Sequence, residues 1–254
     1  MNTFRIKAYA KINLGLDVLR RRPDGYHEVK MIMQTVDLYD DLEFTKLAED
    51  EIRIFTDKEE LPADQGNLIW RAAARMKELY QISEGVSVKL TKRIPIAAGM
   101  AGGSADAAAV LVGLNELYGA RLSMNELCAL GASIGADVPF ALMGGTCRVQ
   151  GLGDVLKPLP PLPECWFTVV MPDYGVSTPE AFAAYDRVGS SVHPDCAAQE
   201  AAIRAEDLDG VCAAAGNALE ECSGAKDNEA IKNALRENGA VTAPVSYTHL
   251  RAHE

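Results

Sequence analysis

The sequence predicts an α+β protein of two domains, with residues 1–160 in the first and residues 161–254 in the second. Three observations support this prediction. Alternating apolar residues, typical of strands, dominate the start of the chain, and apolar residues at helical spacing dominate several later segments. A glycine-rich loop joins a strand to a helix within the first domain. The proline-dense segment KPLPPLPECW, which begins at Lys157, is the best candidate for a linker.

The first domain begins with strands. Residues 4–18 alternate apolar and polar side chains, and we expect an interruption of this strand near Lys11 and Asn13. The residues Pro23 to Gly25 predict a turn, because proline presets φ and glycine accepts a positive φ. Further strands are expected over residues 29–46, 50–57 and 85–95.

Helices follow the strands. They are predicted over residues 67–80, 104–118 and 123–134. Asn67 suits the N-cap of the first, Gly119 suits the end of the second, and Gly135 breaks the third before a further short element. In the second domain we expect a strand over residues 166–171 and two alanine-rich helices between residues 197 and 235.

The amino-acid composition and the net charge argue against several classes of protein. Hydrophobic residues make up 48% of the 254-residue chain and charged residues 24%, and the net charge of −11 argues against binding to nucleic acid or to anionic membranes. The six cysteines form no C-x-x-C pair and no metal-ligand spacing, so we interpret them as reduced structural thiols. The N-terminal MNTFRIKAYAKINLGL lacks the apolar core of a signal peptide, and no apolar run approaches a membrane span. We therefore expect a cytoplasmic protein.

The stretch PIAAGMAGGSADAAA, from Pro95 to Ala109, carries the clearest chemical signal. Glycines immediately before a helix leave backbone N–H groups open to an anion, and the helix dipole favours negative charge there. The loop is neither G-x-x-x-x-G-K-[ST] nor G-x-G-x-x-G. The local pattern alone therefore leaves a phosphate site and an ordinary tight turn equally open.

The same stretch resembles the phosphate-binding loop of the GHMP kinases, the superfamily that includes galactokinase, homoserine kinase and mevalonate kinase. Three further blocks resemble the superfamily in order and spacing: AYAKINLGLDVLRRRPDGYHEV, NLIWRAA and GADVPFALMGGTCRVQGLGDVLKPL, with a looser similarity in MPDYGVSTPEAF. The resemblance implies an α+β fold with a ribosomal-S5-like N-terminal domain and a ferredoxin-like C-terminal domain. It also implies a kinase that depends on ATP and Mg²⁺, with active-site residues from both domains.

Within the superfamily the chain is most similar to the branch that phosphorylates the 2-hydroxyl of 4-diphosphocytidyl-2-C-methyl-D-erythritol in non-mevalonate isoprenoid biosynthesis. The implied substrate is thus a small molecule that carries a cytidine diphosphate. The resemblance further implies that the loop wraps the ATP phosphates, that Ser104 lies near the magnesium, and that Asn67 and Lys89 lie near the adenine. The implied ATP-binding residues are Pro95, Ala97, Gly99, Met100, Ala101, Gly102, Gly103, Ser104, Asn67 and Lys89. Asp106 is interpreted as structural, because the helix dipole favours a carboxylate there.

For catalysis the resemblance implies that Asp137 is the base that receives the proton of the attacking hydroxyl. It implies that Lys11 lies beside Asp137, lowers the pKa of that carboxyl and stabilises charge in the transition state. On the residues alone, Asp137 in GADVPF is a turn or N-cap aspartate. Lys11, between Ala10 and Ile12, is on the same grounds a lysine whose charged end reaches the surface.

A cytidine diphosphate requires an aromatic stack for its base and hydrogen bonds to the base edge. The resemblance implies stacking by Tyr26, an edge contact by His27, and a second stacking face from Phe182, with Tyr185 as the alternative. The implied substrate-binding residues are Asn13, Tyr26, His27, Thr178 and Phe182. On the local pattern alone, Tyr26 is a tyrosine in a surface turn and His27 is a polar surface residue.

The resemblance ends after Gly239 and Ala240. The serine- and glycine-rich third motif of the superfamily does not follow, so we expect an incomplete C-terminal domain in which residues 241–254 are foreign to the family. Two alternatives stay open: a GHMP kinase for another small alcohol, and a catalytically silent nucleotide- or metabolite-binding protein. Small molecules, rather than nucleic acid or membranes, are the expected partners, and the chain is expected to be a monomer or a weak homodimer.

Overall fold

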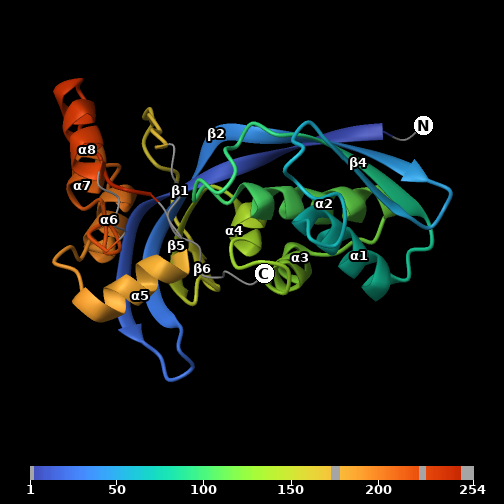
Figure 1. Cartoon of the computed structure of the whole chain (residues 1–254), viewed down its shortest axis with the longest axis horizontal. Helices are drawn as coiled ribbons and strands as arrows, with labels where there is room; N and C mark the ends of the chain where they lie inside the picture. Colours follow the sequence, from blue (N-terminus) through green and yellow to red (C-terminus); the bar gives the residue numbers. More distant parts are fainter. Residues whose placement is uncertain (1–2, 173–177, 223–226, 247–254) are drawn as a thin grey trace. The chain divides into compact units, whose positions relative to one another are not determined.

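The structure is a computed structural model that describes residues 3–172, 178–222 and 227–246 (Figure 1). Its contacts divide the chain into two compact units. Unit 1 comprises Met1–Lys11 and Val36–Gly144, and unit 2 comprises Ile12–Thr35 and Gly145–Glu254. Two long strands, β1 (Thr3–Arg21) and β2 (His27–Leu47), contribute residues to both units. The boundary expected near residue 160 stays a prediction about folding domains, because packing units and folding domains need not coincide.

The strands of unit 1 bury one face. Residues 41–47 of β2 pair antiparallel with β4 (Gly85–Thr91), and β4 pairs in parallel with β3 (Ile52–Thr56). The buried face carries alternate residues of β2 and β4: Leu42, Phe44, Val86, Val88 and Leu90. This alternation is typical of a sheet with a single core face, and it confirms the strands expected here.

The interruption expected near Lys11 and Asn13 is wrong, because β1 is one continuous strand. Both side chains are only 2% exposed, so these polar residues lie in the interior and do not mark a turn. A lysine and an asparagine resemble a strand break in the sequence because buried polar residues are uncommon and need specific partners.

Four helices of unit 1 gather on one side of its strands (Figure 1): α1 (Leu68–Tyr80), α2 (Gly102–Tyr118), α3 (Met124–Ala132) and α4 (Val138–Met143). Their ends follow local capping chemistry. Oδ1 of Asn67 accepts a hydrogen bond from the N–H of Ile69 at 2.9 Å, which confirms the predicted N-cap of α1. Gly119 ends α2 with a φ of +63°, as predicted, and Ser123 starts α3 with a capping box.

Unit 2 contains the hairpin formed by the second part of β1 and the first part of β2. Gly25 has a φ of +87° in the connecting turn, and its N–H donates to the carbonyl of Arg22 at 3.1 Å, which confirms the predicted turn. Residues 29–34 of β2 pair antiparallel with β5 (Thr146–Gly151), which pairs with β6 (Val155–Pro158). The short β7 (Gly216–Asn217) runs parallel to β1.

The helices of unit 2 are α5 (Thr178–Val188), α6 (Cys196–Arg204), α7 (Leu208–Ala213) and α8 (Asn228–Glu237). The two helices predicted between residues 197 and 235 are therefore wrong in number, since α6, α7 and α8 occupy that region. Asp207 explains the extra boundary, because its side chain accepts from the N–H of Gly210 and begins a new helix.

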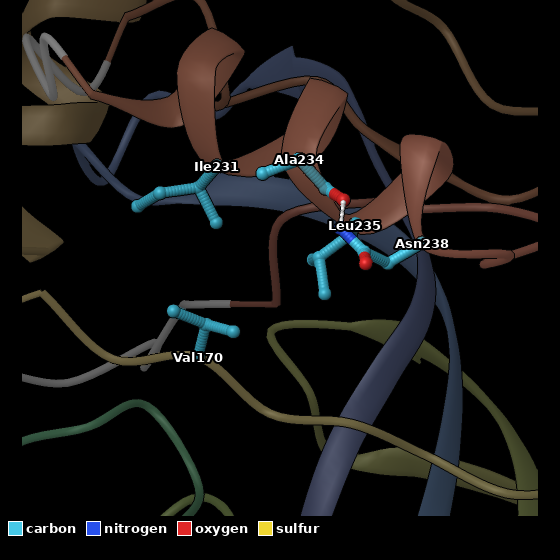
Figure 2. Close-up of a pocket in the computed structure, with 5 residues that line it drawn as sticks. All are labelled: Val170, Ile231, Ala234, Leu235 and Asn238. Carbon is cyan, nitrogen blue, oxygen red and sulfur yellow. Dashed lines mark hydrogen bonds between the residues drawn. The ribbon is translucent and has the colours of Figure 1, made fainter.

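The strand predicted over residues 166–171 is absent: this segment has no regular secondary structure, and Trp166 is 97% exposed. Figure 2 shows Val170 of this segment facing Ile231, Ala234 and Leu235 of α8 across an apolar groove. A strand requires a hydrogen-bonded neighbour, and none of the strand pairings among the described residues includes this segment. Apolar alternation alone could not supply that neighbour.

Two sequence expectations concern groups rather than elements. All six cysteines are free thiols, as expected. In the part of the chain that the structure describes, no helix combines the length and the apolar character that a membrane crossing requires.

Candidate active site

The glycine-rich loop connects β4 to α2 in an unusual backbone conformation. Ala97, Gly99 and Ala101 all have positive φ angles, of 57°, 69° and 57°. Left-handed residues in such a loop turn backbone N–H groups toward a concave surface, which is the geometry of an anion nest. The glycine at position 99 suits this geometry, whereas the left-handed alanines at positions 97 and 101 were not predictable from residue type.

The first turn of α2 directly follows the loop. The N-cap is Ala101, and no side chain caps the helix, so the cap does not occupy the first N–H groups of this 17-residue helix. A Cβ placed on Gly103 would meet only Leu68 Cδ1, at 3.5 Å, so the backbone there is open to a ligand. Met100 and Ala101 are buried and anchor the loop from below. This helix start can bind phosphate through its amides and its dipole.

Lys11 of β1 lies directly against the loop. Its backbone N–H donates to the carbonyl of Met100 at 3.1 Å, and its side chain is 2% exposed. The interpretation of Lys11 as a residue whose charged end reaches the surface is therefore wrong. Burial lowers the pKa of the Lys11 ammonium, and the negative charge of Asp137 acts in the opposite direction, so the two side chains interact electrostatically.

Asp137 occupies the N-cap position of α4, as its local pattern suggests, but its side chain makes no capping hydrogen bond. The side chain is nevertheless buried, at 7% exposure. The same turn approaches the start of α2, since a Cβ on Gly135 would lie 3.5 Å from Oγ of Ser104. Unit 1 thus brings together Lys11, Asp137, Ser104 and the glycine-rich loop.

The two residues expected near the adenine differ in their surroundings. The side chain of Asn67 is engaged at both ends, because Oδ1 caps α1 and Nδ2 donates to the carbonyl of Pro62 at 2.8 Å. Lys89 is exposed on β4, between the buried Val88 and Leu90, and its side chain points to the opposite face of the strand from theirs. The structure therefore does not bring Lys89 to the core face on which α2 packs.

His27 is the centre of a second cluster, in unit 2. It is 6% exposed, and Phe182 of α5 stacks on its ring with centroids 4.7 Å apart and planes 20° apart. Tyr185 contacts the same ring edge-on at 6.3 Å and donates its hydroxyl to the carbonyl of Val18 at 3.2 Å. Both candidate stacking residues therefore touch His27, and the view of His27 as an ordinary surface histidine is wrong.

A carboxylate that the sequence did not reveal holds this histidine. Nε2 of His27 lies 2.7 Å from Oδ1 of Asp186, and Arg21 lies 3.4 Å from Oδ2 of the same residue. Asp186 is one turn of α5 after Phe182, so the two side chains lie on the same face of the helix. This spacing is the feature of the sequence that could have predicted Asp186 as a neighbour of Phe182.

The other residues expected at the substrate lie in unit 2. Tyr26 follows the hairpin turn and is 36% exposed. Asn13 has a buried side chain, and its backbone N–H donates to Oγ of Ser246 at 2.8 Å. Ser246 belongs to the segment 241–254 that the sequence marks as foreign, of which residues 247–254 lie outside the described residues. The side chain of Thr178 also lies outside them.

Comparison with known proteins identifies the family. The model of the GHMP kinases N terminal domain matches residues 67–145. A 4-diphosphocytidyl-2-C-methyl-D-erythritol kinase of Bacillus cytotoxicus is 46% identical over 237 residues, which cover 92% of this chain and 82% of that protein. The enzyme of the same name from Bacillus subtilis is 47% identical over 236 residues, which cover 92% and 81%. The chain belongs to the 4-diphosphocytidyl-2-C-methyl-D-erythritol kinase family.

A solved structure supports the same assignment at the level of the fold. The crystal structure of a 4-(cytidine 5'-diphospho)-2C-methyl-D-erythritol kinase matches with a TM-score of 0.77 at 30% identity, covering 96% of this chain and 87% of that chain. The predicted α+β GHMP kinase fold is confirmed. This member of the 4-diphosphocytidyl-2-C-methyl-D-erythritol kinase family is a kinase, and membership implies that it uses ATP and acts on a small molecule.

Proposed function

We propose that this kinase transfers the γ-phosphate of ATP to the 2-hydroxyl of 4-diphosphocytidyl-2-C-methyl-D-erythritol. The substrate is the one in the names of the relatives. The observation that carries the proposal is the position of the Lys11–Asp137 pair: two oppositely charged side chains, both buried, directly against an anion-binding loop. Burial of two charges is costly even when they are paired, and the position of this pair beside a loop suited to phosphate supports its use in the reaction.

The pair divides the chemistry between its members. The carboxylate of Asp137 accepts the proton of the attacking hydroxyl, and the freed oxygen forms the new bond to the γ-phosphorus as the bond to the β-phosphate oxygen breaks and ADP leaves. The Lys11 ammonium places a positive charge beside Asp137 and offsets the negative charge of the transferred group. Desolvation of both groups strengthens these interactions, because water screens them less.

The nucleotide is bound mainly by backbone in this proposal. The amides at the start of α2 and in the loop receive the phosphates, and the conformation of Ala97, Gly99 and Ala101 holds those amides in place. Magnesium fits this site as an ion that arrives with ATP. The described residues contain no group of three or more His, Cys, Asp or Glu side chains that could hold a metal, and the hydroxyl of Ser104 would offer one oxygen ligand to Mg²⁺ besides the phosphates. Bound there, Mg²⁺ would neutralise charge on the phosphates.

The acceptor substrate is bound through its cytidine in this proposal. His27 contacts the base edge, Tyr26 and Phe182 stack on its faces, and Asn13 and Thr178 contact the remainder. Support comes from the buried His27, which the carboxylate of Asp186 orients beside two aromatic rings. We also propose that the protein is a monomer or a weak homodimer, which size-exclusion chromatography would measure.

The test is ADP release measured with ATP, Mg²⁺ and the cytidine-diphosphate substrate. Asp137→Ala should lower kcat by about 10³-fold, the scale of a lost general base. The variant leaves the buried Lys11 ammonium without the opposite charge of Asp137, so it should also lose stability, and denaturation shows whether it is folded where kcat is measured. The matched control is Asp195→Ala at the N-cap of α6, where the side chain accepts from the N–H groups of Ala197 and Ala198. It should lower the free energy of unfolding by about 1 kcal/mol and leave kcat unchanged.

Three results would contradict the proposal in different ways. Equal kcat in the wild type and in Asp137→Ala would remove Asp137 from the reaction. Turnover only with a different alcohol would leave a GHMP kinase of another specificity. Binding of ATP without turnover of any alcohol would indicate a silent binding protein.

A further inference from the structure

Asp40, Lys92 and Asp106 form a buried charge cluster beneath the glycine-rich loop. The Lys92 ammonium donates to Oδ2 of Asp40 at 2.6 Å and to Oδ2 of Asp106 at 2.6 Å. The three side chains are only 0–5% exposed. None of them belongs to the catalytic pair or to the phosphate-binding residues described above. A lysine enclosed by two carboxylates costs desolvation energy, so its hydrogen bonds must serve some structural need.

The first carboxylate fixes the segment that leads into the loop. Oδ1 of Asp40 accepts from the backbone N–H groups of Arg93 at 2.5 Å and of Ile94 at 2.8 Å, immediately before Pro95. The N–H of Lys92 itself donates to Oδ1 of Asp57 at 2.9 Å. With the bond from Lys92 to Asp106, five hydrogen bonds from residues 92–94 to carboxylates set the position of the chain where the loop begins.

The second carboxylate fixes the helix on which the loop ends. Asp106 lies one turn inside α2, and Lys92 links it to Asp40 across the loop. The start of α2 also rests on this lysine, since a Cβ on Gly102 would lie 2.9 Å from the Lys92 ammonium and 3.0 Å from Ile94. Glycine is needed at position 102 because the helix backbone approaches the buried cation so closely.

We propose that Asp106 and Lys92 are positioning residues for ATP: through Asp40 they clamp the two ends of the 95–101 loop at the spacing that points its amides at the phosphates. Lys92 does not bind a phosphate in this arrangement, because two carboxylates enclose its ammonium. The role rests on the proposed use of the loop for ATP, but it does not depend on which alcohol is phosphorylated.

The test measures the effect of the clamp on ATP binding separately from its effects on folding and on turnover. Asp106→Ala removes the link from Lys92 to α2 and leaves Asp40 and Lys92 as a neutral pair. Calorimetry without the acceptor substrate then measures the Kd for ATP in the absence of phosphoryl transfer. We expect the Kd for ATP to rise about 10-fold, the equivalent of about 1.4 kcal/mol, with the KM for the acceptor substrate unchanged. Asp106→Asn keeps an oxygen that can accept from Lys92, so it should restore the Kd to within about three-fold of the wild type.

The matched control is Asp41→Ala. Asp41 is the neighbour of Asp40, but it forms its ion pair at the surface, with Arg93 at 2.6 Å, and its loss should leave the Kd for ATP unchanged. If Asp106→Ala does not fold, Asp106→Ser, which is also too short to reach Lys92, has the same expected Kd. A folded Asp106→Ala or Asp106→Ser variant that binds ATP as tightly as the wild type would overturn the clamp. If the wild type binds ATP but does not phosphorylate the cytidine substrate, the proposed function fails and the ATP comparison still decides the role of Asp106.

Discussion

At the scale of single residues, the contact between His27 and Asp186 decides what the buried imidazole can recognise. A carboxylate only accepts hydrogen bonds, so the proton lies on Nε2 of His27, 2.7 Å from Oδ1 of Asp186. In the neutral ring, Nδ1 is then left as the acceptor. The amino group of cytosine is a donor, so this tautomer is the one that complements it.

Removal of this carboxylate should therefore weaken acceptor binding specifically. We expect Asp186→Ala to raise the KM for the cytidine substrate about five-fold, the loss of about one net hydrogen bond, and to leave the KM for ATP unchanged. Steady-state kinetics with each substrate varied in turn measures both values. Asp17→Ala removes a similar pair in the same unit, between Asp17 and His193 at 2.8 Å, and should change neither KM. An equal rise in both KM values would mean that Asp186 acts on the fold and not on recognition.

At the scale of elements, helix α2 is pressed unusually close to the sheet of unit 1. A Cβ on Gly113 would lie 2.9–3.0 Å from three ring carbons of Phe44, which is fully buried in β2. Alanine normally stabilises a helix relative to glycine by up to about 1 kcal/mol, but a core that must shift loses about 1–3 kcal/mol. The cost of shifting the core should exceed the gain in helix propensity, because the ring of Phe44 lies in a close-packed interior.

Gly113→Ala should accordingly lower the free energy of unfolding by about 1–2 kcal/mol, as measured by chemical denaturation. The same substitution in a Phe44→Leu background should be neutral or stabilising, because the smaller side chain makes room for the new methyl group. Destabilisation of equal size in both backgrounds would show that the ring is not the cause.

The helix ends that were predicted correctly are set by hydrogen bonds between residues close together in the sequence. Asn67, Ser123 and Gly119 delimit helices through contacts within a few residues, and such contacts can be inferred from residue type. Strand β1 was harder because Lys11 is stabilised in the interior by Asp137, more than a hundred residues away along the chain. The strand prediction over residues 166–171 was wrong because an apolar pattern along the chain does not show whether a partner strand lies beside it.

The residues of the candidate site also fall into those that the sequence indicated and those that it did not. Family motifs indicated Lys11, Asp137 and the loop, because those residues recur in recognisable sequence blocks. They did not indicate Asp186, or the clamp of Asp40, Lys92 and Asp106, because each of these acts through distant partners. The packing units were equally hidden: β1 and β2 each contribute to both units, and a division of that kind leaves no linker composition in the sequence.

At the scale of the whole molecule, this chain, whose net charge is −11, buries three aspartates among its described residues: Asp40, Asp106 and Asp137. Burial raises the pKa of Asp106 from 3.8 to about 7, although Lys92 acts to lower it. Oδ1 of Asp106 has no hydrogen-bond partner among the described residues, which favours a proton at this carboxyl. With that proton, the cluster of Asp40, Lys92 and Asp106 is electrically neutral.

The stability of the fold should therefore depend on pH through this residue. Between about pH 4 and pH 7 the folded chain keeps a proton on Asp106 that the unfolded chain releases, so this contribution is complete below pH 4 and is lost as the pH rises to about 7. Asn cannot ionise, so the Asp106→Asn variant lacks this dependence. We expect the free energy of unfolding of the wild type to fall relative to Asp106→Asn by at least about 1 kcal/mol between pH 5 and pH 8, since one proton contributes at most about 1.4 kcal/mol per pH unit. Denaturation curves of both proteins at each pH measure the difference, in which the carboxyls common to both proteins cancel. Parallel stability profiles would mean that Asp106 is ionised throughout this range and that Lys92 fully offsets the cost of its burial.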